Sequence, residues 1–283
     1  MFRRAIAAAF LAGTIALPMG AGAAEGDVID FDFSFEGPFG TYDSYQLQRG
    51  LQIFNDVCAS CHGLEYLSFG SLSDATGPAL PEDQVKAIAA NYECTDPELE
   101  PGETRPCLPS DRFPANTTMD APDLTLMAKA RAGFHGPAGL GINQLLYGIG
   151  GPEYIATLLL SYTGEDQEVA GSVLYENTVF PGGLISMAQP LHGDDVDYGA
   201  FTYLGEEVES SVGYVPPAPT LEQEARDIAA FLAWAAEPKM VERKQAGFRN
   251  IIMVILLAVL LWYTNKKLWD PIKNRARGRE GES

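Results

Sequence analysis

Three residues near position 60 have the types and spacing of a cofactor or metal site: Cys58, Cys61 and His62 form the pattern C-x-x-C-H. Four interpretations compete for this pattern: half of a zinc site, a redox dithiol, a haem c attachment site, or chance. A zinc site needs a second ligand pair, but Cys94 and Cys107 lie thirteen residues apart and form no second C-x-x-C. A thioredoxin-like dithiol follows a strand, whereas the residues before Cys58 repeat with a helical period. The pattern is rare by chance in a chain with four cysteines and three histidines. Haem c attachment, by two thioethers and an iron-binding histidine, fits all three residues.

The ligand on the other side of the iron would decide what such a site does. A thioether or a second imidazole closes the iron and favours electron transfer, whereas an open iron can bind peroxide or a gas. The candidates are Met119, Met127, Met187, Met240, His135 and His192. We favour Met187, because its loop "FPGGLISMAQPL" is free to bend over a haem, and place His192 and His135 next.

The first 23 residues have the order of a secretory signal peptide. Arg3 and Arg4 precede a short apolar stretch, and the small residues Ala21 and Ala23 suit cleavage after position 23. A retained membrane helix is the alternative, but the stretch is short for a span. We therefore expect export into a bacterial periplasm.

A second apolar stretch lies near the C-terminus, at 246–264, and is strictly apolar from Ile251 to Tyr263. As a helix, 246–264 would reach roughly 28 Å, close to the thickness of the hydrocarbon layer. A buried core helix is the alternative. We expect a single-pass transmembrane helix at 246–264 in the cell membrane, a periplasmic haem domain at 24–245 and a cytoplasmic tail at 265–283.

Charge is unevenly distributed along the chain. Residues 24–238 contain 7 Lys and Arg against 34 Asp and Glu, a net charge of −27, whereas residues 239–283 carry +6. Nucleic acid is excluded as a natural partner, because its phosphates would be repelled. The acidity can serve solubility alone, or it can steer a basic protein toward this one. The candidate clusters for steering are Glu165–Asp166–Glu168, Asp194–Asp195–Asp197 and Glu206–Glu207–Glu209.

Capping signals predict the two main helices of the exported part. Asp43 with Gln46 starts a helix that runs into Cys58, and Thr220 with Gln223 starts another. Shorter helices are expected at 123–132 and 152–162, and loops rich in Pro, Gly or acidic residues at 73–122 and 164–219. The prediction is a mainly α domain with long loops and little strand, which needs a cofactor at its centre.

Several longer stretches resemble the cytochrome c1 family, the haem c subunits of the ubiquinol–cytochrome c oxidoreductase (cytochrome bc1 complex). They are "SYQLQRGLQIFNDVCASCHGLEYLSF", "APDLTLMAKARAG", "GGPEYIATLLLSYTG", the Met187 loop and "AAFLAWAAEPKMVERKQAG". The similarity covers nearly all of residues 30–273. It implies a class I cytochrome c-like helical haem domain with long loops, one C-terminal transmembrane helix and one covalently attached haem c.

The resemblance also implies roles for single residues. The thioether positions would be Cys58 and Cys61, and the axial ligands of the iron His62 and Met187. Pro122 and Tyr154 would lie against the haem, and Arg131 near a haem propionate. Gly50 would let the first helix cross the last one closely, near Phe231 and Trp234.

Two features depart from the family. Relatives usually carry an arginine where this chain has Gly70. Cys94 and Cys107 lie in a loop where the family has no fixed pair; we expect a disulfide there in an oxidising compartment, worth about 3 kcal/mol. Two free thiols are the alternative.

The function that the resemblance implies is an electron relay rather than an enzyme on its own. Electrons would arrive from the Rieske iron–sulfur protein and leave to a basic cytochrome c, soluble or anchored. The chain would sit with cytochrome b in a respiratory or photosynthetic membrane complex, expected to be dimeric. The rivals are a haem enzyme with an open iron and a free-standing membrane-tethered shuttle. The short connection "EPKMVERKQ" leaves almost no flexible linker for such a shuttle.

Overall fold

The computed structural model describes residues 28–96, 100, 103–131, 148, 150–198, 202–203, 206–207 and 216–280. The expected signal peptide at 1–23, the candidate ligand His135 and the acidic residue Glu209 lie outside the described residues.

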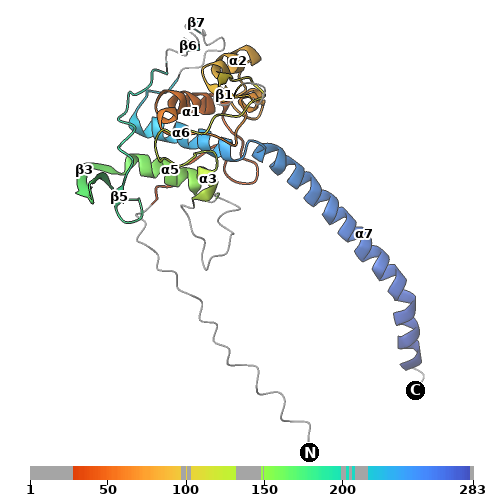
Figure 1. Ribbon diagram of the computed structural model, residues 1–283. Coiled ribbons are helices and arrows are strands. Elements are labelled where there is room, and N and C mark those ends of the chain that lie inside the picture. Colours follow the sequence, from red (N-terminus) through yellow and green to blue (C-terminus); the bar gives the residue numbers. More distant parts are fainter. Residues whose placement is uncertain are drawn as a thin grey trace, which may run out of the picture.

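Two crossing helices form the centre of the domain (Figure 1). They are α1 (Ser44–Asp56) and α6 (Leu221–Ala236). Both predicted caps are confirmed: the Asp43 side chain accepts from backbone N–H groups of α1, and Thr220 accepts from Gln223 N. These bonds satisfy N–H groups that the first turn of a helix otherwise leaves unpaired.

The crossing is close because Gly50 stands at it. A Cβ at this position would lie 2.5 Å from Phe231 Cβ and would also press on the backbone of Asp227. Phe231 and Trp234 are fully buried, and their rings lie 5.8 Å apart. The expected close approach of the two helices at Gly50 is therefore confirmed.

A buried polar group ties the same two helices together. Arg49 Nε lies 2.6 Å from Asp227 Oδ2, and Arg49 also lies over the Tyr198 ring at 5.5 Å. Gln46 and Gln223 each donate to Asp227 Oδ1, at 3.2 and 2.8 Å. A buried charge is tolerated when it is paired and hydrogen-bonded in this way.

The helices α5 (Gly151–Leu160) and α3 (Met127–Ala130) pack beside α6. The helix expected at 152–162 is thus confirmed, whereas the one expected at 123–132 is a single turn. Its first part is instead a turn organised by side chains of 122–125, described below. Gly151 lets α5 approach α3, since a Cβ there would collide with the Ala128 carbonyl.

The interpretation of 73–122 as loop was incomplete. The 3₁₀ helix η2 (Phe69–Ser73) is followed by α2 (Glu82–Ala90), and β1 (Glu93–Thr95) pairs with β2 (Thr104–Pro106). Helix α2 buries Val85, Ile88 and Ala89, a helical period, but its cap position is Pro81, which makes no side-chain cap. The many prolines around it hid this short element.

The interpretation of 164–219 as loop was also incomplete. A three-stranded antiparallel sheet is formed in the order β3 (Tyr162–Val169), β4 (Ser172–Asn177) and β5 (Leu184–Ile185). Its tight turn uses left-handed backbone at Ala170 and Gly171. Most of β3 is exposed, so its sequence lacks the alternation of apolar and polar residues that indicates a half-buried strand. A further pair, β6 (Thr202–Tyr203) and β7 (Glu206–Glu207), follows.

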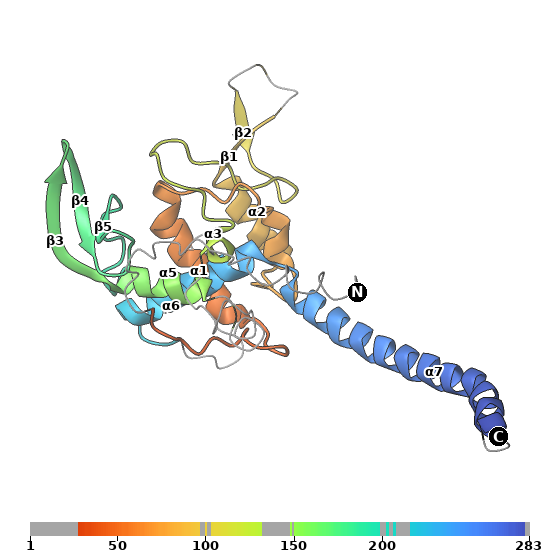
Figure 2. The same ribbon diagram turned by 90° about the horizontal axis from the view of Figure 1, so that it is seen from below.

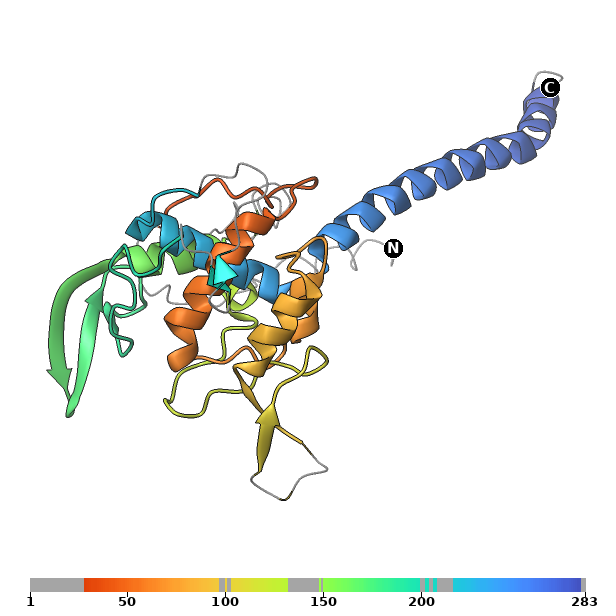
Figure 3. The same ribbon diagram turned by 90° about the horizontal axis from the view of Figure 1, so that it is seen from above.

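The hairpins project from different sides of the helical core, and α7 (Met240–Glu280) leaves in another direction (Figures 2 and 3). Met240–Ile272 is long and apolar enough to cross a membrane, and an 18-residue stretch within it has a mean hydropathy of 1.9. The large apolar side chains of 251–263 are exposed. The core-helix alternative is therefore wrong, and α7 is a single-pass membrane anchor; the exact limits 246–264 stay a prediction.

Candidate functional site

The C-x-x-C-H pattern forms a tight turn at the end of α1. Its first residues make the 3₁₀ helix η1 (Cys58–Ser60), and the N–H groups of Cys61 and His62 both donate to Cys58 O, at 3.1 and 2.9 Å. Both cysteines are free thiols, and neither is bonded to the other. The turn therefore gathers two thiols and one imidazole within five residues of one loop.

Hydrogen bonding fixes the tautomer of His62. Its Nδ1 lies 2.7 Å from Pro122 O. A carbonyl oxygen can only accept, so Nδ1 carries the hydrogen and Nε2 carries the lone pair. Metal-binding histidines are oriented by such a bond in many proteins. The structure thus gives Pro122 a role through its carbonyl, while its ring is exposed.

The segment that follows His62 is held against 123–125. Asp123 accepts from Glu65 N at 2.7 Å and from Thr125 N at 2.9 Å, and Thr125 Oγ1 accepts from Tyr66 N at 3.3 Å. These positioning residues were missed in the sequence. The signal was present in "PDLT", because an aspartate two residues before a bonded N–H is typical of an Asx-turn.

The electrostatics of Cys58 differ from those of a redox dithiol. Burial, and secondarily the neighbouring Cys61, raises the pKa of the Cys58 thiol to about 12. Reactive dithiol cysteines have lowered pKa values, because the thiolate is the nucleophile. The donor set fits haem c better: two unpaired thiols, and one imidazole whose Nε2 is available to iron.

Met187 follows β5 on a loop and is partly buried against the hydrophobic core. Tyr162, the first residue of β3, donates its hydroxyl to Met187 O at 3.0 Å. Tyr162 is therefore a positioning residue for this loop that sequence reasoning did not find. The role of Met187 as an iron ligand stays a prediction.

The other methionines occupy less suitable places. Met119 is 57% exposed, and Met240, at the first position of α7, is 8% exposed within the core. Met127 packs against the core from α3. Met187 combines a loop position with partial burial, which a ligand that must reach a cofactor needs.

The remaining sequence candidates lie in diverse environments. The His192 side chain is 67% exposed, with Nδ1 3.8 Å from Asp195 Oδ1. Tyr154 is buried on α5, and Arg131 is exposed directly after α3. The proposed contacts of Tyr154 and Arg131 with a haem stay predictions.

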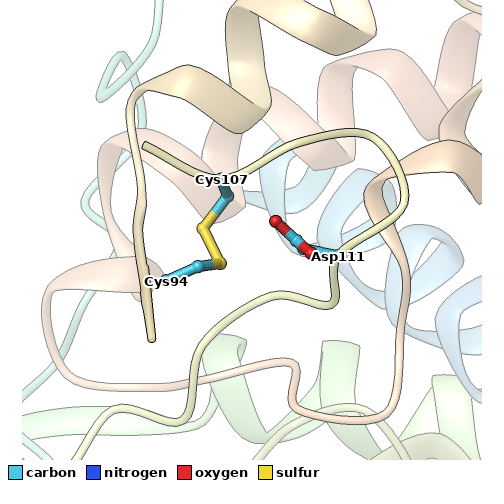
Figure 4. A group of neighbouring side chains, drawn as sticks. All are labelled: Cys94, Cys107 and Asp111. Carbon is cyan, nitrogen blue, oxygen red and sulfur yellow. A yellow bond between two sulfur atoms is a disulfide. The ribbon is translucent and has the colours of Figure 1, made fainter. Parts of the chain in front are cut away.

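Cys94, Cys107 and Asp111 form a second group of potential ligands (Figure 4). Cys94 and Cys107 are joined by a disulfide, with Cα atoms 5.0 Å apart, so this group is not a thiolate metal site. Asp111 instead accepts from Arg105 Nη1 at 2.6 Å, and this bond lowers its pKa. The expected disulfide is confirmed, and the free-thiol alternative is wrong.

Gly70, the departure from the family pattern, fits its surroundings. Its N–H donates to Pro109 O at 2.7 Å, and a Cβ at position 70 would lie 3.0 Å from the same oxygen. Here 68–70 runs antiparallel to 109–112, with a bridge between Ser68 and Arg112. A larger residue at 70 would have to move this loop.

The acidic clusters differ in their structural use. Glu165, Asp166 and Glu168 are exposed on β3. Asp195 accepts from the N–H groups of His192 and Gly193, at 2.5 and 2.9 Å, and so organises its own loop. Asp194 and Asp197 are exposed as well, so exposure alone does not separate this cluster from the one on β3.

Comparison with known proteins identifies relatives along nearly the whole chain. The sequence model of the Cytochrome C1 family matches residues 33–272. Cytochrome c1 of Cereibacter sphaeroides is 43% identical over 281 residues, which cover 94% of this chain and 97% of the relative. Cytochrome c1 of Rhodobacter capsulatus is 42% identical, covering 91% and 95%. Cytochrome b/c1 of Bradyrhizobium diazoefficiens is 36% identical over 84% of this chain and 35% of that longer protein. With the family pattern running through both the C-x-x-C-H turn and the membrane anchor, the chain belongs to the Cytochrome C1 family.

Proposed function

We propose that this protein relays electrons from the Rieske iron–sulfur protein to a soluble or anchored cytochrome c. As a member of its family it is a c-type cytochrome of the bc1 complex with one covalent haem c. On its own it would carry electrons rather than act as an enzyme. The observation that carries the proposal is the bond between His62 Nδ1 and Pro122 O in the C-x-x-C-H turn, which leaves Nε2 for iron.

Four side chains would hold the cofactor. Cys58 and Cys61 would form the thioethers, and His62 and Met187 would bind the iron. When bound, haem c supplies reversible one-electron chemistry, and a thioether ligand raises its potential. The Pro122 carbonyl orients the imidazole, and the Tyr162 hydroxyl holds the backbone of the Met187 loop.

The junction with the anchor supports membership of a fixed complex over a roaming shuttle. Only residues 237–239 separate α6 from α7. Lys239 pairs with Asp74 at 3.1 Å, and Lys129 pairs with Glu237 at 3.4 Å. The name cytochrome b/c1 of one relative agrees with cytochrome b as a neighbour. We infer a dimeric complex with cytochrome b and the Rieske protein.

Electrostatics favour a basic cytochrome c as the acceptor. The net charge of −27 over residues 24–238 would speed encounter with a positive partner, and salt would weaken the effect. The exposed cluster Glu165–Asp166–Glu168 is our candidate for docking it. We further propose that the domain lies in the periplasm, after export by the signal at 1–23, and that 265–283 lies in the cytoplasm.

Optical and EPR spectra of the full-length protein, wild type beside Met187→Leu, test the proposal. A low-spin wild type with a methionine–iron charge-transfer band, lost in the variant together with a fall in potential, is expected. Met119→Leu, at an exposed methionine, is the control and should change nothing. Tyr162→Phe should shift the potential while keeping the band, because it removes only the bond to Met187 O.

Two results would contradict parts of this proposal. An unchanged spectrum in Met187→Leu would overturn Met187 as the ligand and move that role to a histidine such as His192, while the iron would stay closed. A high-spin wild type that binds carbon monoxide would instead favour a haem enzyme with an open iron.

A further inference from the structure

A turn at 35–40, which precedes α1, lies against the first part of the membrane anchor. Lys244 Nζ, on α7, donates to Phe35 O at 2.7 Å and to Gly40 O at 3.4 Å. These two oxygens belong to the two ends of the turn. The carboxylate of Glu36, in the same turn, attracts the charge of Lys244. One side chain of the anchor therefore holds the whole turn against α7.

The tip of this turn reaches further along the anchor than its ends do. Phe39 and Phe248 meet edge to face, with ring centroids 5.4 Å apart. Position 248 follows Lys244 by one helical turn on the same face of α7. Phe39 therefore lies closer than the ends of the turn to the apolar run that begins at Ile251.

This tip is apolar and faces away from the domain. Pro38 is exposed, and Phe39 is 72% exposed. Glu36, the one charged residue of the turn, points inward: its Oε1 accepts from Phe33 N at 3.1 Å, and its carboxyl group contacts that of the buried Glu153. An exposed apolar tip bordered by polar groups is typical of a protein or membrane contact.

Backbone contacts hold the tip in one place. Thr41 N donates to Ser34 O at 3.0 Å, which closes the chain on either side of the turn. A Cβ at Gly40 would lie 2.0 Å from Glu36 O, so the two ends of the turn are in close contact. Phe39 is thus presented by a closed turn and not by a loose loop.

The length of the apolar run places this tip at the surface of the membrane. The run at 251–263 spans roughly 20 Å as a helix, which is less than the roughly 30 Å of the hydrocarbon layer. Lys266 marks the C-terminal end of the span, and a crossing needs about 20 residues, so the other boundary lies close to position 246. Phe248, and with it Phe39, therefore lies at this boundary.

Aromatic side chains mark both ends of the span when the turn is included. Trp262, Tyr263 and Trp269 are exposed toward the C-terminal end of α7. Phe248 is the one aromatic residue of α7 before the apolar run. Aromatic belts form at both boundaries of a bilayer, and Phe39 adds a second ring at this one.

We propose that the turn at 35–40 is a second membrane contact of this protein, with Pro38 and Phe39 inserted beside α7 into the boundary between headgroups and acyl chains. The partner is the lipid bilayer, because the tip continues the lipid-facing surface of the anchor, where Phe248 and Ile251 are 52% and 60% exposed. A single helix leaves the domain free to tilt, whereas two contacts restrict its orientation on the membrane. This contact is separate from the haem and does not depend on electron transfer.

A spin label at position 39 tests the insertion. The full-length holoprotein carries Phe39→Cys with a nitroxide and is reconstituted into phosphatidylcholine vesicles. The four native cysteines are taken up by the haem and by the disulfide, so the new cysteine is the one free thiol of the chain. Power-saturation EPR then compares collisions with oxygen, which concentrates in the hydrocarbon layer, and with a water-soluble nickel chelate. Ile251→Cys on the anchor and Val173→Cys on the β4 strand, whose native side chain is 48% exposed, are the references.

We expect the label at position 39 to collide more with oxygen than with the nickel chelate, as at position 251, and the label at 173 to show the reverse. Lys244→Met should make the label at 39 more mobile and reduce this preference for oxygen, because it releases both ends of the turn. A label at 39 that behaves like the one at 173 would overturn the proposal. A label at 39 whose mobility and collisions do not change in Lys244→Met would contradict the part assigned to that lysine.

A second measurement uses the unaltered protein in its purified complex, because a spin label is itself apolar. Phosphatidylcholine with a photoactivatable group at the start of an acyl chain should label the turn at 35–40 as well as α7, and should leave the hairpin of β3 and β4 unlabelled. Phe39→Ser should lose most of the labelling at 35–40 and keep that of 251–263. Labelling of α7 without the turn would overturn the proposal, and cross-links from the turn to another subunit would show a protein interface in place of lipid.

Discussion

Arg49 on α1 and Asp227 on α6 form a buried ion pair at the crossing of the two central helices, with their side chains 6% and 0% exposed. The two residues are 178 positions apart in the sequence. Their bond joins the helix that carries the C-x-x-C-H turn to the helix that leads to the membrane anchor.

Asp227→Ala should destabilise the domain by about 3–5 kcal/mol, because it leaves the charge of Arg49 buried and uncompensated. Urea unfolding, followed by circular dichroism in detergent, measures the loss. Asp74→Ala is the matched control: it breaks the exposed pair with Lys239 and should cost no more than about 1 kcal/mol. Equal effects of the two variants would contradict this account of the crossing.

Gly50→Ala should destabilise the protein by about 1–3 kcal/mol, although alanine is the better helix former. The added Cβ would meet Phe231 Cβ and the backbone of Asp227, so the helices would have to separate. Gly247→Ala offers the comparison within the same chain, because a Cβ there meets nothing within 4 Å. The melting temperature should fall in Gly50→Ala and should stay level or rise in Gly247→Ala.

Removing the disulfide by Cys94→Ser with Cys107→Ser should lower the free energy of unfolding by about 3 kcal/mol in the loop-entropy description. A reductant should destabilise the wild type by a similar amount and leave the double variant unchanged. The test fails if the double variant is as stable as the wild type without reductant.

The stability of the protein should depend on pH through Glu153. Its pKa is raised from 4.5 to about 8 by folding, so the folded state binds the proton more tightly than the unfolded one. The stabilisation is complete below about 4.5 and is lost as the pH rises through about 8, with a slope of at most about 1.4 kcal/mol per pH unit. Glu153→Gln in lipid-free detergent should remove this component of the slope.

Urea midpoints across this range check the prediction. The urea midpoint of Glu153→Gln should rise relative to that of the wild type as the pH rises. The midpoint of Glu165→Gln should match that of the wild type at every pH. If the urea midpoints of wild type and Glu153→Gln change with pH in parallel, this carboxyl does not titrate as proposed.

Local signals predicted those parts of the fold that are fixed by neighbouring residues. The caps at Asp43 and Thr220 were readable because a capping bond spans two or three positions. The hairpin of β3 and β4 was not, because the exposed strand β3 carries no apolar alternation. Helix α2 has the right period at Val85, Ile88 and Ala89, but prolines before it concealed its start.

In the candidate site, too, the features set by neighbouring residues were predictable and those set by distant residues were not. The spacing of Cys58, Cys61 and His62 is a local pattern, and it led directly to the haem interpretation. The partner of His62 is the carbonyl of a residue 60 positions away, and backbone carbonyls leave no mark on side-chain identity. The contact between the Glu153 and Glu36 carboxyl groups and the loop bond of Tyr162 likewise exist only through tertiary packing.

The short junction between α6 and α7 has a kinetic consequence. Tyr42 donates to Ala233 O at 3.2 Å beside this junction. Lys244, on α7, donates to the Phe35 carbonyl of the turn at 35–40. Because these contacts fix the haem domain to its membrane helix, the domain diffuses only together with the membrane complex and cannot rotate toward a donor or an acceptor. If the protein relays electrons as proposed, the proteins that visit it would make all of the movement between donor and acceptor.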